Sequence, residues 1–158
     1  MADRIPMTRT GYEKLEAELK RLRTVERAKI VSEIETARAH GDLAENAEFH
    51  AAKERQSYIE GRVRILEDRL ARAQVIDPSG QALDRVRFGM TVVLEDTDTG
   101  DRATYTILGE EEADAANGRI SVTSPVARAL LGKEVGESVT VRVPKGTREF
   151  EILEIRVD

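Results

Sequence analysis

The sequence contains no cysteine and no tryptophan, and aromatic residues make up only 4% of its 158 residues. Without cysteine the chain has neither a disulfide framework nor a thiolate zinc site, which excludes the zinc-finger classes. The scarcity of large side chains disfavours a single deep core and suits an elongated helical protein. Composition therefore favours a rod-like part combined with a small globular part.

Long apolar runs are also missing. No stretch approaches the roughly 20 residues that span a bilayer, and residues 1–6 lack the apolar segment of a signal peptide. We therefore expect a cytosolic protein without a membrane partner. The formal net charge of −5 argues against a general nucleic-acid coat, because phosphate binding depends on clustered lysine and arginine. Any contact with nucleic acid is expected to be local.

Two long segments carry the apolar spacing of paired helices. Steps of three and four residues connect the members of each stripe, and charged residues fill the other faces, which is typical of coiled coils. The first stripe is Leu15, Leu19 and Leu22, continued after a stutter by Ile30, Ile34 and Ala37, and the second is Ile59, Val63, Leu66, Leu70 and Ala73. Only a short turn at residues 41–46 separates the segments, so we predict an antiparallel helical hairpin with arms about 45 Å long.

The pattern changes from helical periodicity to alternation after residue 77. The turn sequence Asp77-Pro78-Ser79-Gly80 ends the second helix, so we predict a helical domain at residues 1–77, a linker at 78–85 and a second domain at 86–158. Five strands are expected, at residues 91–94, 103–108, 120–123, 138–143 and 149–157, with one short helix at 127–131. The predicted fold class is therefore α+β, with a mainly antiparallel sheet in the second half.

Three carboxylates, Asp42, Glu45 and Glu48, follow one another at intervals of three residues in and after the turn. Carboxylate oxygens are hard ligands suited to Mg²⁺, which usually takes only one or two protein carboxylates. A pair of them can therefore complete a metal site that a partner mostly supplies. The alternative is that Asp42 caps the second helix, while Glu45 and Glu48 favour its positive N-terminal end.

The whole string around the turn, ARAHGDLAENAEFHAAKE at residues 37–54, closely resembles the signature of the Gre family of bacterial transcript-cleavage factors. The resemblance extends to IPMT at residues 5–8, AQVID at 73–77 and ISVTSPVARALLGKE at 120–134, and hence covers essentially the whole chain. It implies a coiled-coil finger, with an acidic tip at residues 41–48, that enters the secondary channel of RNA polymerase. It also implies a small FKBP-like C-terminal domain that docks on the rim of that channel.

The resemblance implies a function as well: a bacterial elongation factor that stimulates RNA polymerase to hydrolyse the 3′ end of a backtracked transcript, and so rescues arrested complexes. Such a factor is not an enzyme by itself. Asp42 and Glu45 match the tip residues that help to hold the second Mg²⁺ and orient water in the polymerase active site. We expect no tightly bound cofactor, and metal binding by this pair only within the polymerase complex. Asn46, Glu48 and Phe49 are expected to support the tip.

Further residues at the tip are candidates through the same resemblance. Arg38, His40 and Lys53 match a region that contacts the nascent RNA near its 3′ end. Lys53 stands where arginine is more usual, and lysine lacks the bidentate fork of arginine. Alternatively, Arg38 and Lys53 belong to a solvated helix face, and His40 merely offsets a helix dipole. Phe49 is expected to pack across the end of the hairpin, with base stacking as the minor alternative.

In the C-terminal half, Ser124, Pro125 and Arg128 lie in a segment that resembles the polymerase-docking surface of the family. The alternative is simply a turn and the start of a helix. An FKBP-like fold could suggest prolyl isomerase activity, but the few aromatic residues speak against an aromatic-lined proline pocket.

Two other functions fit parts of the same sequence. A regulator that occupies the channel and inhibits the polymerase would keep the finger but carry a differently arranged tip, so the Asp-x-x-Glu spacing at Asp42 and Glu45 disfavours it. A coiled-coil scaffold with a peptide-binding domain would use the tip only as a helix cap. Binding to RNA polymerase separates this last function from the other two.

Overall fold

The structure, a computed structural model, describes residues 3–42 and 45–158. The chain divides into two compact units. The first comprises Tyr12–Ala73 together with Asp3, and the second comprises Arg4–Gly11 and Gln74–Asp158. Helices make up the first unit and a five-stranded sheet dominates the second, so the predicted α+β class is confirmed. The domain limits expected at residues 77 and 86 stay predictions.

The first long helical run consists of three segments, α1 (Arg9–Arg21), η1 (Leu22–Glu26) and α2 (Arg27–Arg38). Thr8 caps its start, because the Thr8 hydroxyl accepts a hydrogen bond from the N–H of Gly11 at 3.1 Å. The middle segment η1 is a π-helical turn, which contains one residue more than an α-helical turn would. The expected stutter between Leu22 and Ile30 coincides with this turn. The surplus residue is absorbed there, and both Leu22 and Ile30 remain buried.

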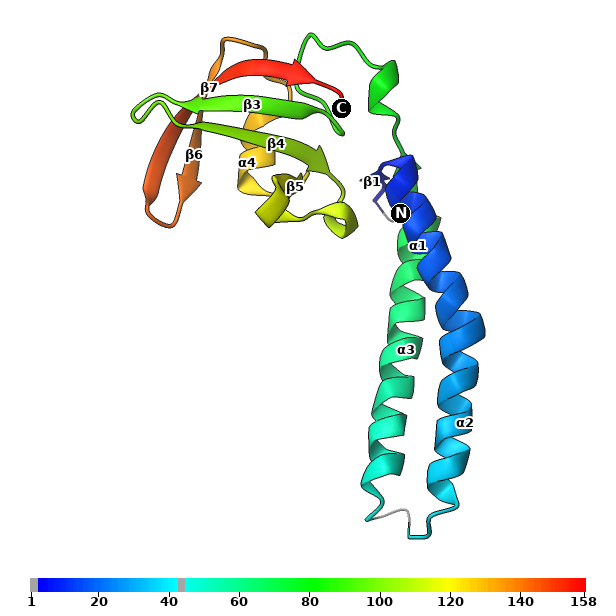
Figure 1. Cartoon of the computed structure of the whole chain (residues 1–158). Coiled ribbons are helices and arrows are strands. Elements are labelled where there is room, and N and C mark those ends of the chain that lie inside the picture. Colours follow the sequence, from blue (N-terminus) through cyan, green and yellow to red (C-terminus); the bar gives the residue numbers. More distant parts are fainter. Residues whose placement is uncertain (1–2, 43–44) are drawn as a thin grey trace. The chain divides into compact units, whose positions relative to one another are not determined.

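Helix α3 (Ala47–Ala71) packs alongside α2 within the first unit (Figure 1). Ion pairs show that the two run in opposite directions, since Arg27 near the start of α2 meets Glu60, and Glu33 further along α2 meets Arg55. The apolar stripe lies between the helices as expected, with Leu70 and Ala73 only half buried. The buried members are Leu15, Leu19, Leu22, Ile30, Ile34, Ala37, Ile59, Val63 and Leu66, and Ala52 of α3, which was not predicted, is buried as well.

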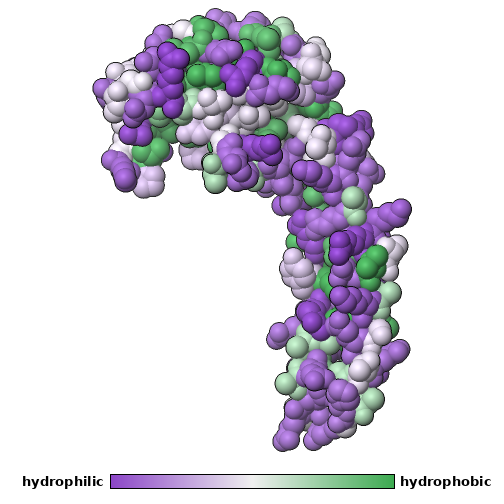
Figure 2. Space-filling model, viewed as in Figure 1, coloured by the Kyte–Doolittle hydropathy of each residue, from purple (hydrophilic) through white to green (hydrophobic). Residues whose placement is uncertain are grey.

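Charged side chains flank this narrow seam on both sides. Arg62 donates two hydrogen bonds to Glu18, at 2.7 and 3.0 Å, and Arg27 binds Glu60 in the same two-pronged way, at 2.7 and 2.8 Å. These bonds hold the pKa of Glu18 and of Glu60 below the ordinary value of a glutamate. On the face shown in Figure 2, the helical unit is accordingly mostly hydrophilic, with scattered hydrophobic side chains.

The second unit is built on one sheet whose strands lie in the order β5-β4-β3-β7-β6. Its strands are β3 (Thr91–Asp96), β4 (Arg102–Leu108), β5 (Arg119–Ser121), β6 (Ser138–Val143) and β7 (Gly146–Arg156). All neighbours are antiparallel except β4 and β5, which are parallel. The mainly antiparallel sheet is therefore confirmed, with strand ends shifted by up to three residues.

Helix α4 (Pro125–Leu130) contributes Ala127 and Leu130, both fully buried, to the core of this sheet. Val92 and Leu94 of β3 and Ile152 of β7 lie at the centre of that core with no exposed surface. Short 3-10 segments, η2 (Pro78–Gly80), η3 (Glu110–Glu112) and η4 (Ala115–Asn117), occur in the connections. A separate two-stranded sheet of β1 (Ile5–Met7) and β2 (Ala73–Val75) is an element that the sequence pattern did not predict.

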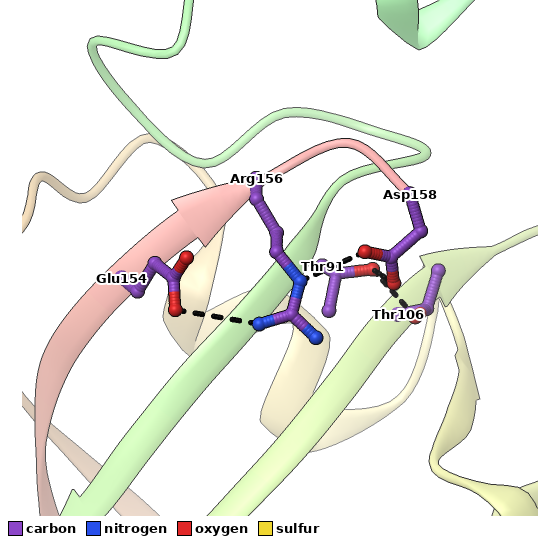
Figure 3. A network of polar contacts seen from close by, with 5 residues as sticks. All are labelled: Thr91, Thr106, Glu154, Arg156 and Asp158. Carbon is purple, nitrogen blue, oxygen red and sulfur yellow. Dashed lines mark hydrogen bonds and ion pairs between the residues drawn. The ribbon is translucent and has the colours of Figure 1, made fainter.

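A network of polar contacts links side chains of β3, β4 and β7 with Asp158 (Figure 3). The buried hydroxyl of Thr91 donates a hydrogen bond to Asp158 at 3.0 Å. The hydroxyl of Thr106, 2.8 Å away, is then placed to donate to the Thr91 oxygen. Arg156 donates to the other oxygen of Asp158 at 2.8 Å and contacts Glu154 at 3.3 Å. The bonds from Arg156 and Thr91 lower the pKa of the Asp158 carboxyl. These contacts join Thr91, Thr106, Glu154, Arg156 and Asp158 into one network.

Candidate functional site at the tip of the helical unit

The candidate site is the turn between α2 and α3, where the predicted carboxylates lie. Asp42 and Glu45 are both exposed to solvent, on either side of Leu43 and Ala44, which lie outside the described residues. Gly41, just before them, has a φ of 113°, a backbone conformation that favours glycine. The turn thus offers two solvent-facing carboxylates at the far end of two long helices.

Asn46 is the residue that joins the two helices. Its side-chain oxygen accepts a hydrogen bond from the N–H of Phe49 at 3.0 Å, which makes Asn46 the N-cap of α3. Its amide nitrogen donates to the carbonyl of Ala37 at 2.6 Å, and so satisfies an end group of α2. The alternative that Asp42 caps α3 is therefore wrong, because the helix begins at Ala47, five residues later. Asparagine is itself a favoured N-cap, so this signal was present in the sequence.

A second contact crosses the tip between His40 and Glu48. Nδ1 of His40 lies 3.0 Å from Oε2 of Glu48, although both side chains are more than half exposed. His40 follows the end of α2, and Glu48 lies in the first turn of α3, where a carboxylate also favours the positive end of the helix. The structure thus brings together an expected RNA-contact residue and an expected supporting residue.

Arg38 and Phe49 form a third link between the helices. The guanidinium carbon of Arg38 lies over the Phe49 ring at 5.9 Å from its centroid, a cation–π geometry. His50 contacts the same ring edge-on, with 5.6 Å between the ring centroids. Lys53, one turn further along α3, donates to Gln56 at 3.1 Å and is exposed. Arg38 and Lys53 thus lie on either side of the tip with their charged groups near its surface.

The carboxylates of the tip do not make a complete metal site. Among residues 3–42 and 45–158, no group of three histidine, aspartate or glutamate side chains is arranged to hold a metal ion. A Mg²⁺ ion usually retains waters and takes one or two carboxylates with phosphate oxygens. Two exposed carboxylates, Asp42 and Glu45, therefore fit the part of a ligand set that another molecule completes.

The docking candidates of the second unit lie at the start of α4. The hydroxyl of Ser124 accepts a hydrogen bond from the N–H of Ala127 at 3.3 Å, so Ser124 is the N-cap of α4, with Pro125 as its first residue. Pro125 and Arg128 are exposed. Their role in docking stays a prediction. In the part of the chain that the structure describes, no helix has the length and apolar character needed to cross a membrane.

Comparisons with known proteins agree with the tip motif. The family model described as "Transcription elongation factor, N-terminal" matches residues 5–75, and the one described as "Transcription elongation factor, GreA/GreB, C-term" matches residues 80–157. "Transcription elongation factor GreA" of Hyphomonas neptunium is 56% identical over 153 residues, covering 97% of this chain and 98% of the relative. The protein of the same name from Anaeromyxobacter sp. (strain K) is 59% identical, covering 94% and 90%.

A solved structure described as that of "the transcription factor Gfh1" is 32% identical and covers 98% of this chain and 99% of its own, with a TM-score of 0.48. The two family models together span both units, and the relatives match over nearly their full length. The chain therefore belongs to the GreA/GreB family of transcription elongation factors.

Proposed function

We propose that this elongation factor stimulates RNA polymerase to cleave backtracked transcripts, rather than acting as an enzyme on its own. In this proposal the helical unit is the coiled-coil finger that enters the secondary channel, and the second unit is the FKBP-like domain that docks outside through the region of Ser124, Pro125 and Arg128. One observation carries the proposal: Asp42 and Glu45 are exposed, and they lie in the turn between the two paired helices α2 and α3.

The length of the helices suits this role. The run from Arg9 to Arg38 contains 30 residues and is therefore about 45 Å long. The narrow seam and hydrophilic surface of the helical unit allow it to enter a water-filled channel without exposing a large apolar face (Figure 2). The tip can then reach a reacting phosphate that a globular domain cannot approach.

At the polymerase active site, the carboxylate oxygens of Asp42 and Glu45 would serve as ligands of Mg²⁺ and as hydrogen-bond acceptors for water. A bound Mg²⁺ pair lowers the pKa of the attacking water and stabilises charge on the attacking and leaving oxygens. Arg38 and Lys53 supply positive charge beside the carboxylates, which suits contact with the phosphates near the RNA 3′ end. The contact of the Arg38 guanidinium with the Phe49 ring restricts the position of this charge.

The proposal is tested with backtracked complexes of a bacterial RNA polymerase. Asp42→Ala combined with Glu45→Ala is expected to lower the maximal rate of transcript cleavage by about a hundredfold or more, the scale seen when a charge-stabilising group is removed from an active site. The affinity for polymerase should stay within about twofold, because the contacts of the second unit are untouched.

The matched control is Glu35→Ala combined with Glu54→Ala, which removes the same charge from exposed positions on α2 and α3. Cleavage by this control should equal that of the wild type. A tip variant that cleaves normally would overturn the proposal. Inhibition of elongation by the wild type without any cleavage would instead identify a channel-blocking regulator, and failure to bind polymerase would leave only a scaffold role.

A further inference from the structure

The link between His40 and Glu48 connects the residues that follow α2 with the first turn of α3. Beyond α2, the chain makes three backbone hydrogen bonds: from Ala39 N–H to the Glu35 carbonyl at 3.3 Å, from His40 N–H to the Ala37 carbonyl at 3.1 Å and from Gly41 N–H to the Arg38 carbonyl at 3.5 Å. The last of these is at the limit of a hydrogen bond. The side-chain contact of His40 adds to this weak backbone contact.

On the other side, the loop ends at Asn46, whose side chain is bonded to both helices. Side-chain contacts thus lie on both sides of the carboxylates, at His40 before Asp42 and at Asn46 after Glu45. The Asn46 contact explains itself as a helix cap. The His40 contact is not a helix cap, because Nδ1 of His40 contacts Oε2 of Glu48 and not a terminal backbone group.

We propose that His40 is a positioning residue, which acts through Glu48 to hold the loop that carries Asp42 and Glu45. This inference rests on the proposed function. It replaces the expected contact of His40 with RNA by an intramolecular role: the imidazole and the Glu48 carboxylate form a clamp across the tip, here called the His40–Glu48 clamp.

The chemistry of the clamp is a hydrogen bond that needs a proton only on Nδ1. Nδ1 donates to the Glu48 carboxylate both in the neutral Nδ1–H tautomer and in the imidazolium form. The 3.0 Å separation is normal for such a bond. A donor placed like Nδ1 should therefore replace the imidazole. The amide of asparagine extends its NH₂ group about as far from the backbone as Nδ1, so His40→Asn is the conservative variant.

The expected effect lies in the reaction rate rather than in folding. Both partners are exposed, and such pairs contribute little to overall stability. Displacement of reacting groups by about 1 Å, however, can cost about a hundredfold in rate. Loss of the His40–Glu48 clamp should therefore lower the maximal cleavage rate by about tenfold. The factor concentration that gives half-maximal stimulation should stay within about twofold of that of the wild type.

The test is a double-mutant cycle on the full-length factor with backtracked polymerase complexes. His40→Ala and Glu48→Ala are each expected to lower the maximal cleavage rate by about tenfold, and the double variant by no more than either one, because both remove the same contact. His40→Asn should restore the rate to within about threefold of the wild type. Glu54→Ala, which removes an exposed carboxylate from the same helix, is the control and should have no effect.

An RNA contact by His40 predicts a different pattern. Glu48→Ala would then leave cleavage unchanged, or the losses of the two single variants would multiply in the double variant, and either result overturns the inference. A loss that appears only in the half-maximal factor concentration also overturns it, since that pattern indicates weaker binding to polymerase.

Amide hydrogen exchange of the free factor keeps the clamp testable even if the proposed function fails. Peptides that cover residues 38–49 should exchange faster by the same factor in His40→Ala and Glu48→Ala, and at the wild-type rate in Glu54→Ala. Unchanged exchange in the first two variants would contradict the inference that the clamp holds the tip, whatever the cleavage assay shows. If exchange is faster in the two variants as expected but the wild-type factor does not stimulate cleavage, only the proposed function is overturned.

Discussion

The two units bury their apolar residues in different ways. In the second unit, Val92, Leu94, Ile107, Leu130 and Ile152 all have no exposed surface, because a sheet and α4 enclose them. In the helical unit, one stripe along each helix forms the seam, and of its members only Leu66 has no exposed surface. Paired arginine and glutamate side chains complete that seam. The comparison indicates that packing in three dimensions holds the second unit, whereas helical phase and flanking charge hold the first.

Single-residue deletions should break this comparison most strongly, since the helical unit depends on phase. Removal of Val25, which is exposed within the π-turn η1, would convert that turn into an ordinary α-turn and leave Leu22 and Ile30 in the seam. We expect a folded factor with cleavage activity near that of the wild type. Removal of Arg64 from α3, which has no such turn, rotates Leu66 about 100° out of the seam and should cost at least about 3 kcal/mol.

Urea unfolding followed by circular dichroism measures both deletions, with the wild type at the same concentration as the reference. Equal losses in the two variants would show that the π-turn does not carry the surplus residue. A stable Arg64 deletion would show that the seam tolerates a change of phase.

Truncation of one isoleucine in each core sharpens the comparison at a smaller scale. Ile152→Ala should destabilise the second unit by about 4 kcal/mol, because rigid neighbours on every side leave a cavity. Ile34→Ala should cost the helical unit about 2 kcal/mol, because Ile34 is 8% exposed and its site can partly collapse or admit water. Hydrogen exchange of peptides from each unit at increasing urea concentration reads the two losses separately. The opposite order would contradict the proposed difference in packing.

Acid should weaken the helical unit slightly, through the ion pairs beside its seam. Hydrogen bonds from Arg62 and Arg27 lower the pKa of Glu18 and of Glu60 in the folded state, below the ordinary 4.5. Each carboxylate thus contributes stability that is present above its unfolded pKa and is lost as the pH falls through the lower folded pKa. For the partly exposed Glu18 the contribution is under about 1 kcal/mol after solvent screening.

Thermal melts between about pH 7 and pH 3 test this. Glu18→Gln combined with Glu60→Gln should melt earlier than the wild type at neutral pH and should lose less stability on acidification. Glu35→Gln combined with Glu54→Gln, at exposed positions, serves as the control. Identical pH profiles for all three proteins would show that these pairs contribute nothing measurable.

Much of the architecture follows from the sequence because the two units use different periodicities. The steps of three and four residues identify both stripes, and alternation identifies all five strands of the second unit. The pairing of Ile5–Met7 with Ala73–Val75 is not predictable in this way, because two three-residue strands far apart in the chain leave no periodic signal. The π-turn appears in the sequence only as a stutter.

The contacts at the tip are less predictable from the sequence than the helices are. The family motif identified Asp42 and Glu45 as the carboxylates of interest, but spacing alone also allowed Asp42 to cap the second helix. Asn46 does so instead, and its second bond to the Ala37 carbonyl depends on how closely α2 approaches α3. The contact between His40 and Glu48 likewise requires that two helix ends meet. Such contacts across the turn exist only once both helices have formed.

The π-turn between α1 and α2 has a consequence for how the helical unit can gain or lose residues during evolution. An additional residue in an ordinary α-helix advances the chain by about 1.5 Å and swings everything beyond it by about 100°. When the addition is confined to a π-turn such as Leu22–Glu26, the swing is cancelled and the seam of the remaining helix is preserved. A residue can therefore be added or lost at such a turn while Asp42 and Glu45 keep their bearing about the long axis of the helical unit.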